Sequence, residues 1–130
     1  MKTDARGIGR AGEKAAADYL IRKGYRVIDR NSRLAHGEID LIAENATHLV
    51  FAEVKTRSKS SARFARPGRA VNALKKQRFA SAVRVYTRFH PTDLQPRIDV
   101  IEVWYEEFDN GCAAFEFNHI ERAFGGMNRR

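Results

Sequence analysis

Apolar residues along the chain recur with two periods, and they predict a helix, three strands, a second helix and two strands. Spacings of three and four residues predict helices over 9–23 and 70–89. Short apolar or alternating runs predict strands over 25–30, 39–43, 49–54, 97–104 and 113–117, with polar loops over 31–36 and 56–69. This order favours an α/β domain in which helices flank a central mixed β-sheet.

The first predicted helix carries an acidic residue on its inward face. Glu13 lies at helical spacing from three residues that are expected to pack on the sheet, Ala16, Ala17 and Leu20. Two interpretations stay open for this carboxylate. It either points toward the sheet, or it is an ordinary acidic residue in the first turn, where the helix dipole favours it.

The second predicted helix has cations on its packing face. Its apolar stripe consists of Val71, Leu74, Ala82, Tyr86 and Phe89. Lys75 and Arg78 fall inside this stripe, whereas Lys76 and Arg84 fall outside it. A cation on a packing face either extends its charged end to solvent or reaches an acidic partner. The first alternative is the default for Arg78, and both alternatives are open for Lys75.

Two adjacent predicted strands carry three charged residues. Asp40 lies in the strand 39–43, and Glu53 and Lys55 end the strand that follows. Because residues two apart on a strand share a face, Glu53 and Lys55 point the same way, and Asp40 can lie beside them. A buried charge is costly unless it is paired or bound to a metal. The alternatives are a site of two carboxylates and an ammonium, or a solvent-facing edge with an internal Glu53–Lys55 pair.

A further carboxylate, Asp99, lies inside the apolar strand 97–104. Ile98 and Val100 share one face of this strand, and Ile101 and Val103 lie with Asp99 on the other. A structural pair with a neighbouring arginine is the simple interpretation of Asp99, because a charge in such a strand needs a partner.

Length and composition fit one globular domain. The 130 residues are expected to form a single domain over 1–130, with a core over about 9–120 and flexible ends at 1–8 and 125–130. Cys112 is the only cysteine, so a disulfide within the chain is excluded and a reducing, cytoplasmic setting is expected. No apolar run approaches the ~20 residues of a membrane span, and no signal peptide is predicted.

Positive charge is concentrated in the middle of the chain. The net charge is +8, and no acidic residue occurs from Lys55 to Thr92, an interval with eleven basic residues. A block of one sign on this scale indicates a polyanionic partner such as DNA, and the alternative is a solvated basic face. The candidate contact residues are Arg33, Arg57, Lys59, Arg66, Arg69, Lys75, Lys76 and Arg84.

The residue types near Asp40 suit phosphodiester hydrolysis. Mg²⁺ is commonly held by one or two carboxylates together with water and phosphate oxygens, which matches Asp40 and Glu53. A neighbouring lysine such as Lys55 can position or help to deprotonate an attacking water. Other chemistries are poorly served, since the sequence has no Gly-x-x-x-x-Gly-Lys loop, no Cys/His cluster, no HExxH and no Gly-x-Ser-x-Gly.

Several motifs closely resemble those of the YraN family of small bacterial proteins. The resemblance covers about residues 9–103 and rests on Glu13, Arg30-Asn31, Gly37-Glu38-Ile39-Asp40, the stretch 50–57 and Arg97-Ile98-Asp99-Val100. The family is similar to the restriction-endonuclease-like superfamily, with its PD-(D/E)xK signature, and to archaeal Holliday-junction resolvases, which share the glutamate of the first helix. Here Glu38-Ile39-Asp40 stands where Pro-Asp is usual in the superfamily.

This resemblance implies a restriction-endonuclease-like core of order α-β-β-β-α-β and a metal-dependent nuclease site. Asp40 and Glu53 would hold Mg²⁺ or Mn²⁺, with the backbone carbonyl of Val54 as a further ligand. Lys55 would be the catalytic lysine, and Glu13 would assist at the metal. The expected function is a Mg²⁺-dependent DNA endonuclease, with branched or flapped DNA as candidate substrates and a homodimer as candidate assembly. The alternative is a non-catalytic nucleic-acid-binding module that retains the fold.

Overall fold

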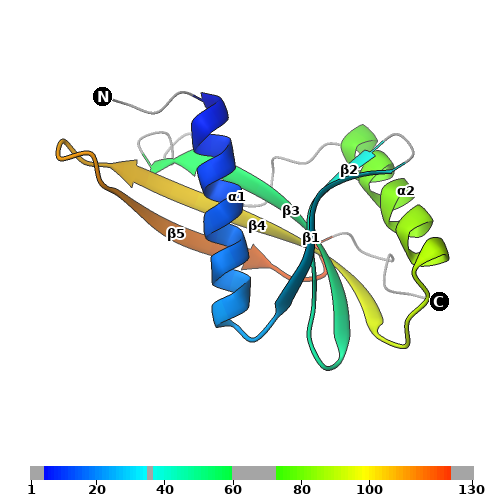
Figure 1. Cartoon of the computed structure of the whole chain (residues 1–130). Coiled ribbons are helices and arrows are strands. Elements are labelled where there is room, and N and C mark those ends of the chain that lie inside the picture. The colour runs from blue at the N-terminus through cyan, green and yellow to red at the C-terminus, as the bar shows by residue number, and fades with distance from the viewer. Residues whose placement is uncertain (1–4, 35–36, 60–72, 124–130) are drawn as a thin grey trace.

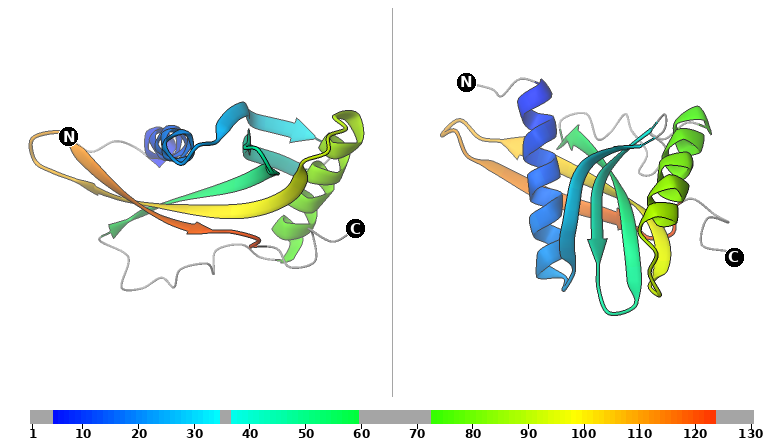
Figure 2. Two further views of the ribbon diagram at one scale, coloured as in Figure 1. Left: turned by 90° about the horizontal axis from the view of Figure 1, so that it is seen from below. Right: turned by 45° about the vertical axis from the view of Figure 1, so that its right-hand side comes forward.

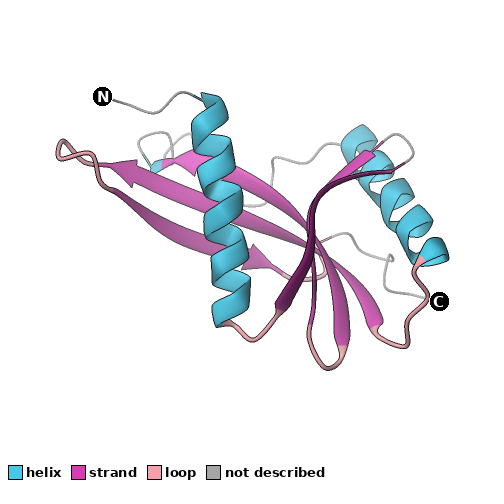
Figure 3. Ribbon diagram, in the orientation of Figure 1, coloured by secondary structure: helices cyan, strands magenta, loops and turns pink. Residues whose placement is uncertain are grey.

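Within the residues that the structure describes, two helices and five strands follow one another in the predicted order. The computed structural model describes residues 5–34, 37–59 and 73–123. Its elements are α1 (Ala5–Arg22), β1 (Arg26–Leu34), β2 (Gly37–Glu44), β3 (His48–Ser58), α2 (Ala73–Phe89), β4 (Gln95–Glu107) and β5 (Ala113–Ile120). Figures 1 and 3 show a twisted sheet with the helices lying against it. The predicted α/β class with a central mixed sheet is therefore confirmed.

The five strands form one sheet in the order β1-β2-β3-β4-β5. Neighbouring strands are antiparallel except β3 and β4, which are parallel, and α2 provides the crossover that a parallel pair needs. The β3–β4 ladder runs from His48 opposite Gln95 to Ser58 opposite Tyr105 and spans the whole of β3. Because this ladder is uninterrupted, pairing with β4 fixes the position of the residues at the end of β3.

The helices pack on opposite faces of the sheet (Figure 2). Alternation along the strands sends one set of apolar side chains to each face. Ile42 of β2 and Phe51 of β3 join Phe79 of α2 in one core cluster. Leu41 of β2 joins Leu20 of α1 in the other. Within the described ranges, no helix is long and apolar enough to cross a membrane.

β2 and β3 pair over part of their length and then separate. Their ladder joins Leu41–Glu44 to Leu49–Ala52. Beyond it, 37–40 of β2 stays in register with β1, while 53–58 of β3 stays in register with β4. This separation, formed by 37–40 and 53–58, is termed the fork. In Figure 1 the two arms of the fork run to opposite sides of the molecule.

A buried ion pair holds the α1 face of β4. Arg97 donates to both oxygens of Asp99, from Nε to Oδ1 at 2.9 Å and from Nη2 to Oδ2 at 2.9 Å. His119 Nε2 lies 2.7 Å from Asp99 Oδ2, and Arg97 Nη2 donates to the hydroxyl of Tyr25 at 2.6 Å. The predicted structural pair of Asp99 with an arginine is confirmed, and it joins β4 to β5 and to Tyr25, the residue just before β1.

Several elements are longer than the sequence pattern predicts. α1 begins at Ala5, so part of the segment expected to be flexible is helical. β1 continues to Leu34 and β3 to Ser58, into stretches predicted as polar loops. Both extensions are paired, β1 with the start of β2 from Ser32 to Leu34, and β3 with β4 through Ser58. The ladder partner, rather than the local sequence, makes these polar residues extended.

The apolar stripe predicted for α2 is partly wrong. The buried residues of the helix are Phe79, Ala82, Val83 and Tyr86. Leu74 and Phe89, two members of the predicted stripe, are instead 55% and 71% exposed, and Val71 lies outside the described residues. The packing face is therefore rotated toward Phe79. Lys75 lies one turn before Phe79 on this same face.

Candidate functional site

Asp40 lies where the fork opens. The next residue, Leu41, is opposite Ala52 at the end of the β2–β3 ladder. Asp40 then accepts a hydrogen bond at Oδ2 from the backbone N–H of Val54, at 2.8 Å. Its side chain thus makes the contact across the strands that the backbone no longer makes, and this holds the carboxylate in place at the fork.

Glu53 lies on the other arm of the fork and is only 4% exposed. Its Oε2 contacts two ammonium groups, that of Lys55 on β3 at 3.3 Å and that of Lys75 on α2 at 3.0 Å. The internal Glu53–Lys55 pair considered from the sequence is therefore present. Glu53 is a buried carboxylate in contact with α2, however, and does not lie on a solvent-facing edge.

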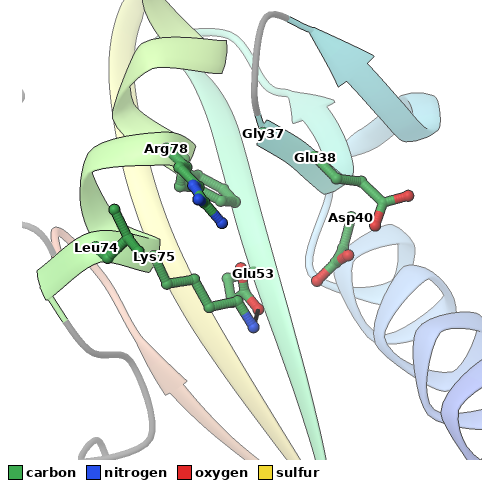
Figure 4. A pocket seen from close by; sticks show the side chains of 8 residues that line it. Gly37, Glu38, Asp40, Glu53, Leu74, Lys75 and Arg78 are labelled. Atoms are coloured by element: carbon green, nitrogen blue, oxygen red, sulfur yellow. Dashed lines mark ion pairs between the residues drawn. The ribbon is translucent and has the colours of Figure 1, made fainter.

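A pocket of about 370 Å³ opens between the fork and α2. It is lined by Gly37, Glu38, Asp40, Glu53, Leu74, Lys75, Arg78 and Phe79. Figure 4 shows Asp40 and Glu53 on the two arms of the fork, with Lys75 and Arg78 reaching into the space from α2. Acidic side chains of the strands thus face basic side chains of the helix. Glu38, Leu74 and Phe79 were not identified as site residues from the sequence.

Two glycines set the helices against the fork. A Cβ atom on Gly37 would lie 2.3 Å from the backbone oxygen of Arg78, so any side chain there would push α2 away from β2. On the other face, a Cβ atom on Gly12 would lie 2.0 Å from Oγ1 of Thr56 on β3. The close approach of both helices therefore depends on the absence of side chains at these positions.

Glu13 is half-buried on α1 and accepts a hydrogen bond from the side chain of Asn31 on β1. Because α1 begins at Ala5, Glu13 lies beyond the first turn, which holds no acidic residue, and the helix-dipole interpretation is wrong. Asn31 has a φ of 53°, in the left-handed region that asparagine tolerates better than most residues. The sequence marks Asn31 through the Arg30-Asn31 motif, but no periodicity reveals its contact with Glu13.

Negative charge accumulates on the strand side of the pocket. Burial, followed by the charge of Glu53, raises the pKa of Asp40 from 3.8 to about 7, although the hydrogen bond from Val54 opposes the rise. Burial also raises the pKa of Glu13, and the charges of Glu38 and Glu53 add to this rise. Burial is the main cause of both rises, and a divalent cation bound at the pocket would oppose them by favouring the charged carboxylates.

The carboxylates of Asp40 and Glu53 at the fork are candidate ligands for Mg²⁺. The part of the chain that the structure describes holds no group of three or more His, Cys, Asp or Glu side chains that could bind a metal ion. Mg²⁺ does not require such a group, because one or two carboxylates with water and phosphate oxygens complete its octahedron. Asp40 and Glu53, which line the same pocket, would supply the carboxylate oxygens, and the carbonyl of Val54 stays a predicted further ligand.

Some of the predicted nucleic-acid contacts lie around the pocket. Arg33 is exposed beside it, with Nε 3.5 Å from Oε2 of Glu38. Lys75 lines the pocket, and Lys76 and Arg84 are exposed on α2. Lys75 therefore places positive charge at the pocket, whereas Lys76 and Arg84 add it to the exposed surface of α2.

The other predicted nucleic-acid contacts lie farther along β3 and just beyond it, or outside the described residues. Nε of Arg57 is 3.7 Å from Oε2 of the fully buried Glu102, an arrangement that also gives Arg57 a structural role. Nζ of Lys59 is 3.0 Å from Oε2 of the exposed Glu116. Two further candidates lie outside the described residues, Arg66 and Arg69.

The raised pKa of Asp40 predicts lower stability at pH 8 than at pH 5. The folded state keeps a proton on Asp40 up to about pH 7, whereas the unfolded chain loses it near pH 3.8, so stability falls as pH rises between these values. The raised pKa of Glu13 acts in the same direction. Urea unfolding in EDTA at both pH values measures the difference. Asp40→Asn should shrink it, and an undiminished difference in that variant would contradict the assignment.

Related bacterial proteins match most of the chain. Residues 12–103 match the uncharacterised protein family UPF0102. The UPF0102 protein of Symbiobacterium thermophilum is 47% identical over 100 residues, covering 76% of this chain and 83% of the relative. That of Caldanaerobacter subterraneus subsp. tengcongensis is 39% identical over 124 residues, covering 95% and 98%. That of Chlorobium phaeobacteroides is 40% identical over 119 residues, covering 90% and 93%. The membership expected from the YraN motifs is thereby confirmed, and the chain belongs to the UPF0102 family.

Proposed function

We propose that this protein is a Mg²⁺- or Mn²⁺-dependent endonuclease that hydrolyses phosphodiester bonds in DNA. The observation that carries the proposal is that Asp40 and Glu53 line one pocket from two separating strands, with Lys55 in contact with Glu53. Carboxylates facing a phosphate repel it unless a cation lies between them. A protein that only binds nucleic acid gains nothing from this pair.

Each residue at the fork has a distinct part in the proposed reaction. Asp40 and Glu53 supply oxygen ligands, and the N–H of Val54 fixes the orientation of the Asp40 carboxylate. When bound, Mg²⁺ supplies positive charge beside the phosphate and makes a water molecule a stronger acid. Lys55, held on β3, orients the attacking water or stabilises the charge that develops on the phosphate. Glu13 adds negative charge that strengthens the hold on the cation.

One observation favours the alternative, a nucleic-acid-binding module that retains the fold. Lys55 and Lys75 already neutralise the buried charge of Glu53, so this carboxylate is satisfied without a metal. The two functions make different predictions for divalent cations. A nuclease needs them for cleavage, whereas a binding module does not use them.

DNA binding should depend steeply on salt and little on sequence, because lysine and arginine release counterions from the phosphates. Replacing the exposed Lys76 and Arg84 by alanine should weaken binding to linear, flapped and four-way DNA alike. The slope of log K against log salt should fall by about 2, one for each lost contact. Fluorescence anisotropy between about 50 and 200 mM salt measures this slope.

The matched control replaces two exposed cations on the other helix, Lys14 and Arg22, by alanine. This control should keep the wild-type slope, because both residues lie on α1, away from the pocket at the fork. A binding constant that is the same at low and high salt would contradict the electrostatic basis of binding.

A cleavage panel tests the proposed function. Linear duplex, single-stranded, flapped and four-way DNA are each incubated with the protein in Mg²⁺, Mn²⁺ or EDTA. The expected result is cleavage of at least one substrate with metal and of none in EDTA. If the protein bound DNA but cleaved no substrate in either metal, the nuclease proposal would be overturned. The nucleic-acid-binding module would then be the remaining function.

A further inference from the structure

Lys75 approaches Glu53 from a different element than Lys55 does. It lies in the first turn of α2, and its Nζ is 3.0 Å from Oε2 of Glu53 (Figure 4). The contact between Gly37 and the backbone of α2 leaves no room for a side chain at that glycine and sets the helix at this distance. The fold therefore brings an ammonium group to a buried carboxylate whose unpaired charge would be costly.

Both lysines at Glu53 compete with a divalent cation for this carboxylate. Its Oε2 already contacts the ammonium groups of Lys55 and Lys75. A cation at the same carboxylate would lie beside both ammonium groups and be repelled by them, so its binding favours the departure of one lysine. The side chain of Lys55 is 18% exposed and that of Lys75 is 45% exposed, so Lys75 is the one that can leave Glu53 at the smaller cost.

We propose that Lys75 is a built-in competitor of the metal. In the metal-free protein its ammonium group neutralises Glu53. When a divalent cation binds, Lys75 leaves Glu53 and contacts the phosphate backbone of the bound DNA. The inference rests on the proposed function, because it concerns the same carboxylate. It couples the two ligands, since the lysine released by the metal becomes a contact for DNA.

Calorimetric titration with Mn²⁺ alone tests the competition. Lys75→Met removes the charge but keeps an unbranched side chain, and it should bind Mn²⁺ about fivefold more tightly, equal to about 1 kcal/mol. Lys75→Arg keeps the charge and should stay within about twofold of the wild type. Lys14→Met is the matched control, because it removes a lysine from an exposed ion pair with Asp18, with Nζ and Oδ2 3.2 Å apart. It should match the wild type.

The outcomes separate this inference from the proposed function. In one outcome, Lys75→Met binds Mn²⁺ no more tightly than the wild type, while Asp40→Asn abolishes binding. This result would overturn the competition between Lys75 and the metal and would support the metal site. If neither the wild type nor Lys75→Met binds Mn²⁺, both proposals are overturned. Binding by Lys75→Met alone supports both, because it shows a metal site that Lys75 blocks.

DNA affinity gives a second readout that a merely structural lysine would not change. Binding is measured in EDTA and in Ca²⁺, a hard cation that also takes oxygen ligands. Lys75→Met should weaken binding about threefold or more in Ca²⁺, where Lys75 is released to a phosphate, and by clearly less in EDTA, where Lys75 stays at Glu53. Equal weakening under both conditions would overturn the exchange of Lys75 between Glu53 and DNA.

Discussion

Replacing either carboxylate at the fork by its amide should abolish DNA cleavage and leave the fold intact. Asp40→Asn and Glu53→Gln each remove a ligand charge, and the expected loss of cleavage rate is on the order of 10³-fold or more. An asparagine at position 40 keeps an oxygen that can accept the hydrogen bond from the N–H of Val54, so the contact across the fork is retained. Single-turnover cleavage with Mg²⁺ measures the loss, and circular dichroism checks the fold.

Comparison with other variants separates loss of metal from loss of structure. DNA binding by Asp40→Asn in EDTA should be unchanged or tighter, because a negative charge that faces the phosphates is gone. Lys55→Ala should retain Mn²⁺ binding and lose most of the rate. Glu38→Gln, which removes a carboxylate that lines the same pocket, is the matched control and should lose less than about tenfold. If Asp40→Asn cleaved DNA at the wild-type rate, Asp40 would be excluded as a metal ligand.

Asp99→Asn should destabilise the protein by about 3–5 kcal/mol, because it leaves the buried Arg97 without its buried charged partner. Asp99 is fully buried and accepts hydrogen bonds from Arg97 and from the backbone N–H of Arg122. Burial disfavours its charge, but the hydrogen bond with His119 and the pairing with Arg97 outweigh burial and lower its pKa. The stability that this carboxylate contributes is therefore present above pH 3.8 and is lost as pH falls below it.

Urea unfolding at pH 7 measures the effect of Asp99→Asn. The matched control is Glu121→Gln, since Glu121 pairs with the same arginine at 3.8 Å but is 45% exposed. An exposed pair is worth about 0–1 kcal/mol, so the control should stay near the wild type. A similar small loss in both variants would show that the buried pair is not a major contributor to stability.

The parts of the molecule that depend on local periodicity were predictable. Alternation in the strand around Asp99 assigns Ile98 and Ile101 to opposite faces, and the two core clusters contain them as assigned. Helical spacing places Glu13 on the side of α1 that packs on the sheet, where Ala16 and Leu20 are fully buried. In these elements each apolar face packs against a single core cluster, so the sequence pattern is sufficient to predict which side chains are buried there.

The parts that depend on a distant partner were not predictable. The stretch 31–34 is polar and resembles a loop, but it pairs with the start of β2 and is therefore a strand. On α2, the rotation that buries Phe79 and exposes Leu74 follows from contact with the sheet and from the space left by Gly37. Lys75 was recognised as a cation on the packing face, but only the tertiary structure shows that its partner is Glu53.

The separation of β2 from β3 explains why the candidate site lies where it does. A continuous ladder would pair the backbone at position 40 and leave no opening between the two strands. Because β2 stays with β1 and β3 stays with β4, the strands part at Asp40 and the pocket forms between them and α2. The same divergence that interrupts the ladder therefore places Asp40 and Glu53 around one space.

Anomalous scattering from crystals soaked in Mn²⁺ tests the proposed metal centre most directly. Mn²⁺ takes the same hard oxygen ligands as Mg²⁺, and its anomalous signal locates it without reference to activity. We predict an anomalous peak in the fork, in contact with the carboxylates of Asp40 and Glu53, with Lys75 moved away from Glu53. A peak only elsewhere on the protein, or none at a Mn²⁺ concentration that saturates binding in calorimetry, would contradict the metal centre.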